Sequence, residues 1–154
     1  MDLAILLNDP VTQRLLVAAG LGALIGLERE LAGKDPSLRT FSLICLGSCI
    51  FTEISRHSIQ YNPNADPARI AAQVVAGISF LGAGAIFRSH RGVSGLTTAA
   101  LMWVTAGIGM SVGFELESMA VTATLIALFI SLSLKLVHTF LGWIGLKNRD
   151  KATE

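Results

Sequence analysis

Long stretches without a charged side chain are the feature that most restricts how this chain can fold. Residues 70–87, 92–114 and 118–134 contain no Asp, Glu, Lys or Arg over 18, 23 and 17 positions, respectively. Two shorter charge-free stretches, 15–27 and 41–52, extend through polar ends. A membrane-spanning helix needs about 20 mostly apolar residues, and it satisfies its own backbone polar groups within lipid. The sequence therefore predicts an all-α, polytopic integral membrane bundle of about five transmembrane helices.

The composition leaves little of the chain outside such a bundle. Of 154 residues, 52% are hydrophobic and 15% are charged. Five spans of about 20 residues each would occupy about two thirds of the chain. We expect a five-helix membrane domain over 1–146 and a cytoplasmic tail over 147–154. Because no arrangement typical of an intramembrane enzyme is present, we expect neither enzymatic activity nor a cofactor, and no nucleic-acid partner.

Three Asp-Pro pairs indicate where helices begin in the first half of the chain. Asp is a favourable N-cap residue, and Pro is well suited to the first helical position. The pairs are Asp9-Pro10, Asp35-Pro36 and Asp66-Pro67. Together with the charge-free stretches they predict spans near 10–32, 36–55, 67–87, 95–113 and 118–138.

The distribution of Lys and Arg predicts the orientation of the bundle. Alternate loops carry eight basic residues on one side and two on the other, and the positive-inside rule places the basic side in the cytoplasm. With five spans, the N-terminus is outside and the C-terminus cytoplasmic. The other side carries Arg56 and Arg69, and the basic side carries Arg29, Lys34, Arg39, Arg88, Arg91, Lys147, Arg149 and Lys151.

Polar side chains from four predicted helices gather at the cytoplasmic boundary. Carboxylates at the C-terminal end of the first helix oppose the helix dipole, so Glu28 needs a positive partner, and Arg39 on the next helix is the obvious one. The start of the fourth helix offers free N–H groups to an anion. Either a structural network of ion pairs or a ligand or partner site is expected here, with no metal ion assigned. Its residues are Glu28, Arg29, Glu30, Arg39, Thr40, Arg88, Thr97 and Thr98.

Other polar and small residues predict contacts inside the membrane. Gln73 lies deep in an apolar segment and favours an interhelical hydrogen bond over a permeation ligand. Glu53, near the opposite boundary, is expected to be solvated. Small residues four positions apart permit close helix approach, either within the bundle or in a homodimer. These pairs are Gly22 and Gly26, Gly109 and Gly113, Ala72 and Ala76, and Gly95 and Ala99.

Four ordered motifs give the chain a resemblance to a known family. It resembles the MgtC/SapB family from residue 10 to about residue 135, in a short form that lacks the C-terminal soluble domain of many relatives. Two departures from the family pattern are Ser79, where members often have Gly, and Leu96-Thr97, where the founding member has Leu-Asn. The motifs are Gly26-Leu27-Glu28-Arg29-Glu30, Leu38-Arg39-Thr40, residues 77–86 (GISFLGAGAI), and residues 93–100 (VSGLTTAA) with Trp103.

The resemblance implies a multi-pass protein of the bacterial inner membrane. It implies a regulatory or accessory role linked to magnesium limitation, acid stress or virulence-type adaptation, exerted through membrane-protein partners such as the F-type ATP synthase. Membrane lipid and a second copy of the chain are further expected partners. The alternative is a transporter or channel for Mg²⁺ or H⁺, possibly formed by a dimer, with Glu28, Gln73 and Glu53 along the path.

Overall fold

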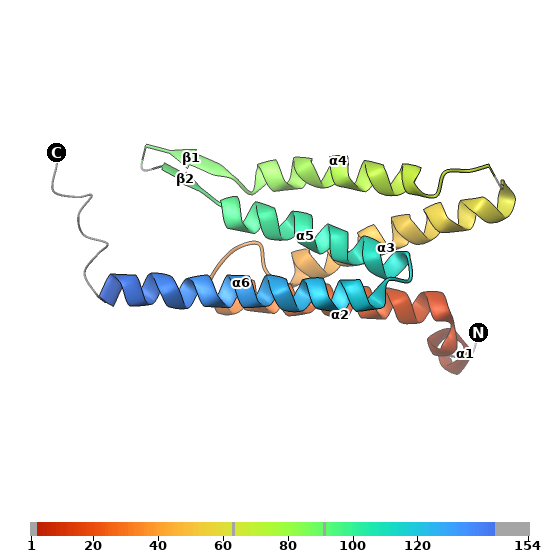
Figure 1. Cartoon of the computed structure of the whole chain (residues 1–154), viewed down its shortest axis with the longest axis horizontal. Helices are drawn as coiled ribbons and strands as arrows, with labels where there is room; N and C mark the ends of the chain where they lie inside the picture. The colour runs from red at the N-terminus through yellow and green to blue at the C-terminus, as the bar shows by residue number, and fades with distance from the viewer. Residues whose placement is uncertain (1–2, 63, 91, 144–154) are drawn as a thin grey trace.

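The computed structural model describes residues 3–62, 64–90 and 92–143, with side chains from residue 5 to residue 133 except residues 6, 63 and 91. The described residues form six helices and one hairpin. The helices are α1 (Leu3–Asn8), α2 (Pro10–Leu31), α3 (Leu38–Tyr61), α4 (Ala68–Gly84), α5 (Leu96–Gly113) and α6 (Glu117–Trp143), and the strands are β1 (Phe87–Ser89) and β2 (Gly92–Ser94). Helices α2–α6 and the hairpin lie along a common long axis, and the short α1 turns away from it (Figure 1). The predicted tail 147–154 and Arg91 lie outside the described residues.

The Asp-Pro pairs predict two of the three helix starts well. The Asp9 carboxylate accepts a hydrogen bond of 2.9 Å from the Thr12 amide, and α2 begins at Pro10, as predicted. The Asp66 carboxylate accepts one of 2.8 Å from the Ala68 amide, where α4 begins. At the remaining pair, Asp35-Pro36, the predicted helix start at residue 36 is two residues early, because α3 begins at Leu38.

Helix α3 occupies the centre of the bundle. It packs against α2, α5 and α4, while α6 lies along α5 and α2 (Figure 1). Fully buried side chains of α3 meet those of α2 and α5 in one apolar core, whose two thiols are both free. Core members include Ala18, Ile25, Phe41, Cys45, Cys49, Ile108 and Val112.

Glycines hold the central helices close together. A methyl group on Gly22 would lie 2.6 Å from the carbonyl oxygen of Phe41, and one on Gly113 would lie 2.6 Å from Cβ of Thr52. A methyl group on Gly26 or on Gly109 would likewise strike the backbone of α3. The contacts predicted for these four glycines are therefore made within one chain, between α2 and α3 and between α5 and α3, so these four glycines are not available for a homodimer.

A short hairpin corrects the expectation of purely helical structure. Strands β1 and β2 pair antiparallel, with Phe87 opposite Ser94, and they project from the bundle beyond α4 and α5 (Figure 1). The predicted third span, 67–87, therefore ends early, at Gly84. Gly92 and Gly95 adopt positive φ angles of 120° and 87°, which allow the chain to turn and re-enter the bundle at α5.

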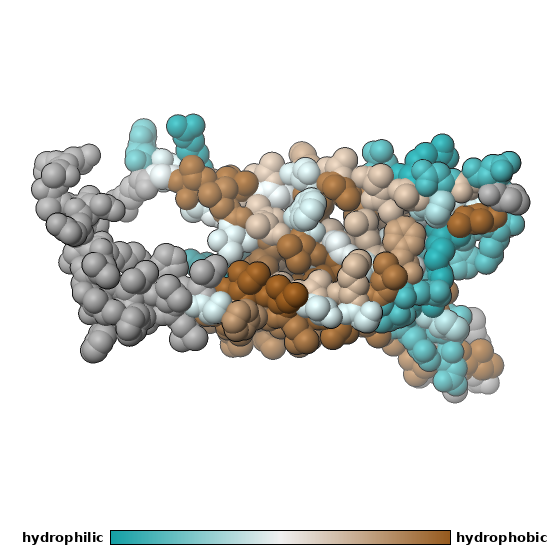
Figure 2. Space-filling model, viewed as in Figure 1, coloured by the Kyte–Doolittle hydropathy of each residue, from teal (hydrophilic) through white to brown (hydrophobic). Residues whose placement is uncertain are grey.

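The apolar surface of the bundle is consistent with a membrane protein. Hydrophobic residues cover the middle of the molecule and hydrophilic ones its ends (Figure 2). By length and composition, α2, α3 and α5 can each cross a membrane, whereas α4 and residues 117–133 of α6 are shorter apolar helices. The five predicted spans correspond to α2–α6, but the number of spans and their orientation stay predictions.

Candidate functional site

The carboxylate of Glu28 pairs with its neighbour Arg29, not with Arg39. Two hydrogen bonds of 2.6 Å run from the Arg29 guanidinium to the two carboxylate oxygens, and both side chains are buried. Ser131 of α6 accepts a hydrogen bond from Arg29 and donates one of 2.9 Å to Glu28. The predicted pair between Glu28 and Arg39 is wrong because α6, which the prediction did not place here, packs beside the end of α2 and supplies the third group.

The remaining predicted site residues divide into an exposed and a buried set. Glu30, Arg39 and Thr40 line one open cavity, so the structure does bring them together. Thr98 is buried, whereas Thr97 and Arg88 are exposed, Arg88 on β1 of the hairpin. Among the residues whose side chains are described, Arg88, Thr97 and Thr98 do not line the cavity that contains Glu30 and Arg39.

A second charged cluster, at the opposite end of the bundle, was not predicted. Arg14 of α2 pairs with Glu53 of α3 and lies 3.0 Å from Glu115, which follows α5. Arg56 is 3.1 Å from Glu53 and 2.6 Å from Glu115. The prediction of a solvated Glu53 is wrong: its side chain is buried, with 6% exposed. An Arg within an apolar helix needs a negative partner, and Arg14 is the sequence signal for this cluster.

Glu115 closes the second cluster from the loop between α5 and α6. Its φ of 62° lies in the left-handed region, which is uncommon for a non-glycine residue. The hydrogen bond and positive charge of Arg56 hold the pKa of Glu115 below its usual value, and the charge of Arg14 acts in the same direction. This cluster, which we call the outer cluster (Arg14, Glu53, Arg56 and Glu115), therefore ties the ends of α2, α3 and α5 together.

An open groove separates α3 from α4. A cavity of about 590 Å³ runs between them and is lined mostly by apolar side chains, with Arg39 and Thr40 at one end and Gln73 toward the other. The same two residues also line a larger cavity of about 1010 Å³, together with Glu30 and Asp35. Gln73 is exposed to the groove, and no hydrogen bond joins it to another described residue, so the predicted interhelical bond is not formed there.

Potential metal ligands are dispersed over the described part of the chain. Among the side chains described between residues 5 and 133, no three of His, Cys, Asp or Glu come together in a way that could hold an ion. The carboxylates that are buried there, Glu28 and Glu53, are each neutralised by arginine. The chemistry that the described residues offer is therefore ion pairing at both ends of the bundle and apolar binding along α3 and α4.

An apolar helical bundle with arginine–carboxylate clusters at both ends is the architecture of an α-helical membrane protein. The comparison with known proteins identifies the family: the family model described as the MgtC family matches residues 15–140. The chain belongs to the MgtC family. This confirms the resemblance that its sequence motifs indicate.

Several bacterial proteins are similar to this chain over most of its length. An uncharacterized protein of Haemophilus influenzae is 38% identical over 94% of the chain and 62% of its own length. "Protein MgtC" of Salmonella typhimurium is 42% identical over 84% and 54%. A protein of Escherichia coli named "Putative magnesium transporter YhiD" is 40% identical over 76% and 57%. The chain thus spans little more than half of these relatives, and no solved structure matches it.

Proposed function

We propose that the protein is a regulatory or accessory component of the bacterial inner membrane that acts during magnesium limitation. Two facts support the link to magnesium: the chain belongs to the MgtC family, and the Escherichia coli relative is named "Putative magnesium transporter YhiD". The protein would act by contact with membrane-protein partners, in acid stress or virulence-type adaptation as well. The F-type ATP synthase and a second copy of the chain are the partners to test first.

The main support for a regulatory function is that the two buried carboxylates are already paired with arginine. Glu28 is held by Arg29 and Ser131, and Glu53 by Arg14 and Arg56. A carboxylate that is already neutralised by a bidentate or double arginine contact is a poor ligand for a passing cation, since the cation must displace the arginine. The glycine contacts between α2, α3 and α5 also favour a fixed bundle. A fixed bundle is better suited to contact with a partner than to alternating access.

A transporter for Mg²⁺ or H⁺ is the second candidate function. The cavity that contains Glu30 and Asp35 favours it, because both carboxylates are exposed there and neither makes an ion pair with another described residue. Two carboxylates at the mouth of an open cavity could collect a divalent cation before it enters a membrane path.

Two measurements on the same protein separate the candidates. The full chain is reconstituted into vesicles that hold a Mg²⁺-sensitive dye, and it is also expressed in a bacterium that lacks its own family member and grows in limiting magnesium. The regulatory function predicts restored growth with no Mg²⁺ entry above that of empty vesicles. Mg²⁺ entry that Glu30→Gln abolishes would overturn the regulatory proposal in favour of transport.

We further infer that α2–α6 each cross the membrane, with the N-terminus outside. Tyr61→Cys, at the end of α3, should react with an impermeant reagent added to intact cells, whereas His90→Cys, beside the hairpin, should not. Cys45 and Cys49 are buried in the bundle, so they contribute little background labelling. The opposite labelling pattern contradicts the orientation.

A further inference from the structure

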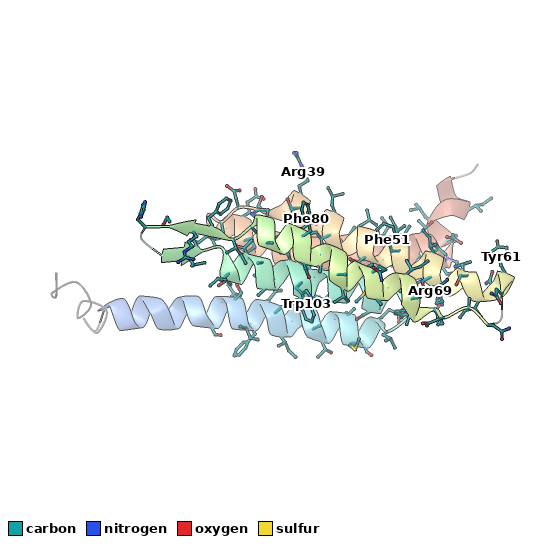
Figure 3. The ribbon with its side chains drawn as sticks, turned by 90° about the horizontal axis from the view of Figure 1, so that it is seen from above. Arg39, Phe51, Tyr61, Arg69, Phe80 and Trp103 are labelled. Atoms are coloured by element: carbon teal, nitrogen blue, oxygen red, sulfur yellow. The ribbon has the colours of Figure 1, made fainter. Side chains whose placement is uncertain are left out.

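The groove between α3 and α4 has the features of a lipid site. Its apolar part is lined along α3 by Leu43, Gly47 and Phe51. From Arg39 to Phe51 is twelve residues, or about 18 Å of helix, and half of a hydrocarbon core of about 30 Å is about 15 Å. The groove therefore has the length of one acyl chain in one leaflet. It runs along the bundle axis, with Arg39 and Phe80 at one level and Phe51 beyond them (Figure 3).

The polar end of the groove carries both signs of charge. Arg39 and Thr40 lie where the apolar cavity meets the larger one, and Glu30 and Asp35 line the larger cavity. No ion pair within the described residues joins Arg39 to either carboxylate, and Arg39 extends outward from the bundle (Figure 3). Arg39 and the two carboxylates therefore border the same open volume without forming an ion pair with each other.

We propose that this groove, whose polar end is bordered by Arg39, Glu30 and Asp35, binds a phospholipid with a primary-amine headgroup, of the phosphatidylethanolamine class. One acyl chain lies along the apolar groove, the phosphate accepts hydrogen bonds from Arg39 and Thr40, and the ammonium group donates to Glu30 and Asp35. An open apolar groove in a bilayer holds acyl chains of any lipid, so the contacts with the headgroup are what select phosphatidylethanolamine. A choline headgroup has no N–H to donate, and a glycerol headgroup has no positive charge.

Two glycines keep the groove open and provide a direct test. A methyl group on Gly47 of α3 or on Gly77 of α4 would have no atom within 4 Å, although both residues line the groove. A leucine at either position therefore fills the groove without striking the backbone. Gly20 of α2 is equally unobstructed but lies on another face, so Gly20→Leu is the matched control.

The experiment is native mass spectrometry of the full chain in mild detergent, with phosphatidylethanolamine, phosphatidylcholine or phosphatidylglycerol of identical acyl chains. A charge-assisted hydrogen bond stabilises by about 1.5–3 kcal/mol, which corresponds to about tenfold or more in affinity. Wild type and Gly20→Leu should retain phosphatidylethanolamine about tenfold better than the other two lipids. Gly47→Leu and Gly77→Leu should lose this retention, and Glu30→Gln with Asp35→Asn should remove the preference over phosphatidylcholine.

Several outcomes overturn the proposal. Equal retention of the three lipids means that the groove is a non-specific annular site. A preference for phosphatidylglycerol means that Arg39 alone selects the lipid, through the lipid's anionic charge. Retention that survives both leucine variants places the lipid elsewhere. A dimer that dissociates in both leucine variants, with no lipid bound, makes a second copy of the chain the occupant. The test does not depend on the proposed role in magnesium limitation, and either proposal can fail alone.

Discussion

The two faces of α3 are built from opposite kinds of contact. Toward α2 and α5, Phe41, Cys45, Cys49 and Thr52 are fully buried, and the glycines of the neighbouring helices press against them. We call this the closed face. Toward α4, the residues in between line a groove, and Gly47 meets no atom where its side chain would be. We call this the open face.

The difference shows that glycine has two distinct uses within one small bundle. On the closed face, glycine permits an approach that any side chain would prevent, so it fixes how the helices pack. On the open face, glycine leaves space unfilled, so it provides volume for a ligand rather than rigidity. The side of α3 decides which use applies. Cys45, which the closed-face glycines contact, and Gly47, which lines the groove, are only two residues apart and point to different sides of the helix.

The largest expected effect compares two arginines at the same end of the bundle. Arg29→Gln leaves Glu28 buried without its guanidinium partner, and breaking a buried ion pair in this way lowers the free energy of unfolding by about 3–5 kcal/mol. Arg39→Gln, on the open face, should change it by less than about 0.5 kcal/mol, as expected for an exposed residue. Equilibrium unfolding in mixed detergent micelles measures both. Equal losses would mean that the open face is as structural as the closed one.

The next effect compares two glycines of α5. Gly109→Ala places a methyl group against the backbone carbonyl of Cys45 on the closed face, and overpacking of this kind destabilises by about 1–3 kcal/mol. Gly107→Ala meets no atom and should stabilise the helix by about 0.5–1 kcal/mol, because alanine has the higher helix propensity. The same unfolding assay should give changes of opposite sign. A Gly109→Ala protein as stable as wild type would show that α3 and α5 can separate without loss.

Charge-free segments and capping residues predicted most of the fold. The helices begin within two residues of the predicted starts, because an apolar stretch and an Asp N-cap are local signals. The hairpin from Phe87 to Ser94 escaped prediction, since its exposed strands are only three residues long and carry no alternating pattern. Helix α3 extends six residues beyond its predicted end at 55, through polar residues that are compatible with a helix outside the membrane.

The contacts of the candidate site residues could not be predicted from the sequence. Which arginine meets Glu28 depends on where α6 lies, and no local feature of Ser131 indicates that it reaches the end of α2. The outer cluster joins residues 14 and 115, so it depends on the packing of helices far apart in sequence. The charge pattern thus pointed to charged groups near the helix ends, whereas the partners of each group required the tertiary structure.

The smallest expected effect concerns the pH dependence of the outer cluster, where the closed face reaches solvent. Because Arg56 lowers the pKa of Glu115 in the folded state, the ionised carboxylate stabilises the fold at pH values above its unfolded-state pKa of about 4.3. That contribution is lost as the pH falls through the folded-state pKa. The difference in thermal stability between wild type and Glu115→Gln should therefore be constant from pH 7 to about pH 5 and shrink as the pH falls further below the unfolded-state pKa of about 4.3.

Glu117→Gln is the matched control for this measurement. Glu117 is exposed in the first turn of α6 and makes no ion pair with another described residue, so its substitution should leave the pH profile close to that of wild type. Glu53 contacts the same two arginines and is present in both proteins, so its contribution largely cancels in the difference. A difference between wild type and Glu115→Gln that does not shrink at any acidic pH at which the protein still folds would show that Glu115 acts through the backbone turn at its left-handed φ rather than through its charge.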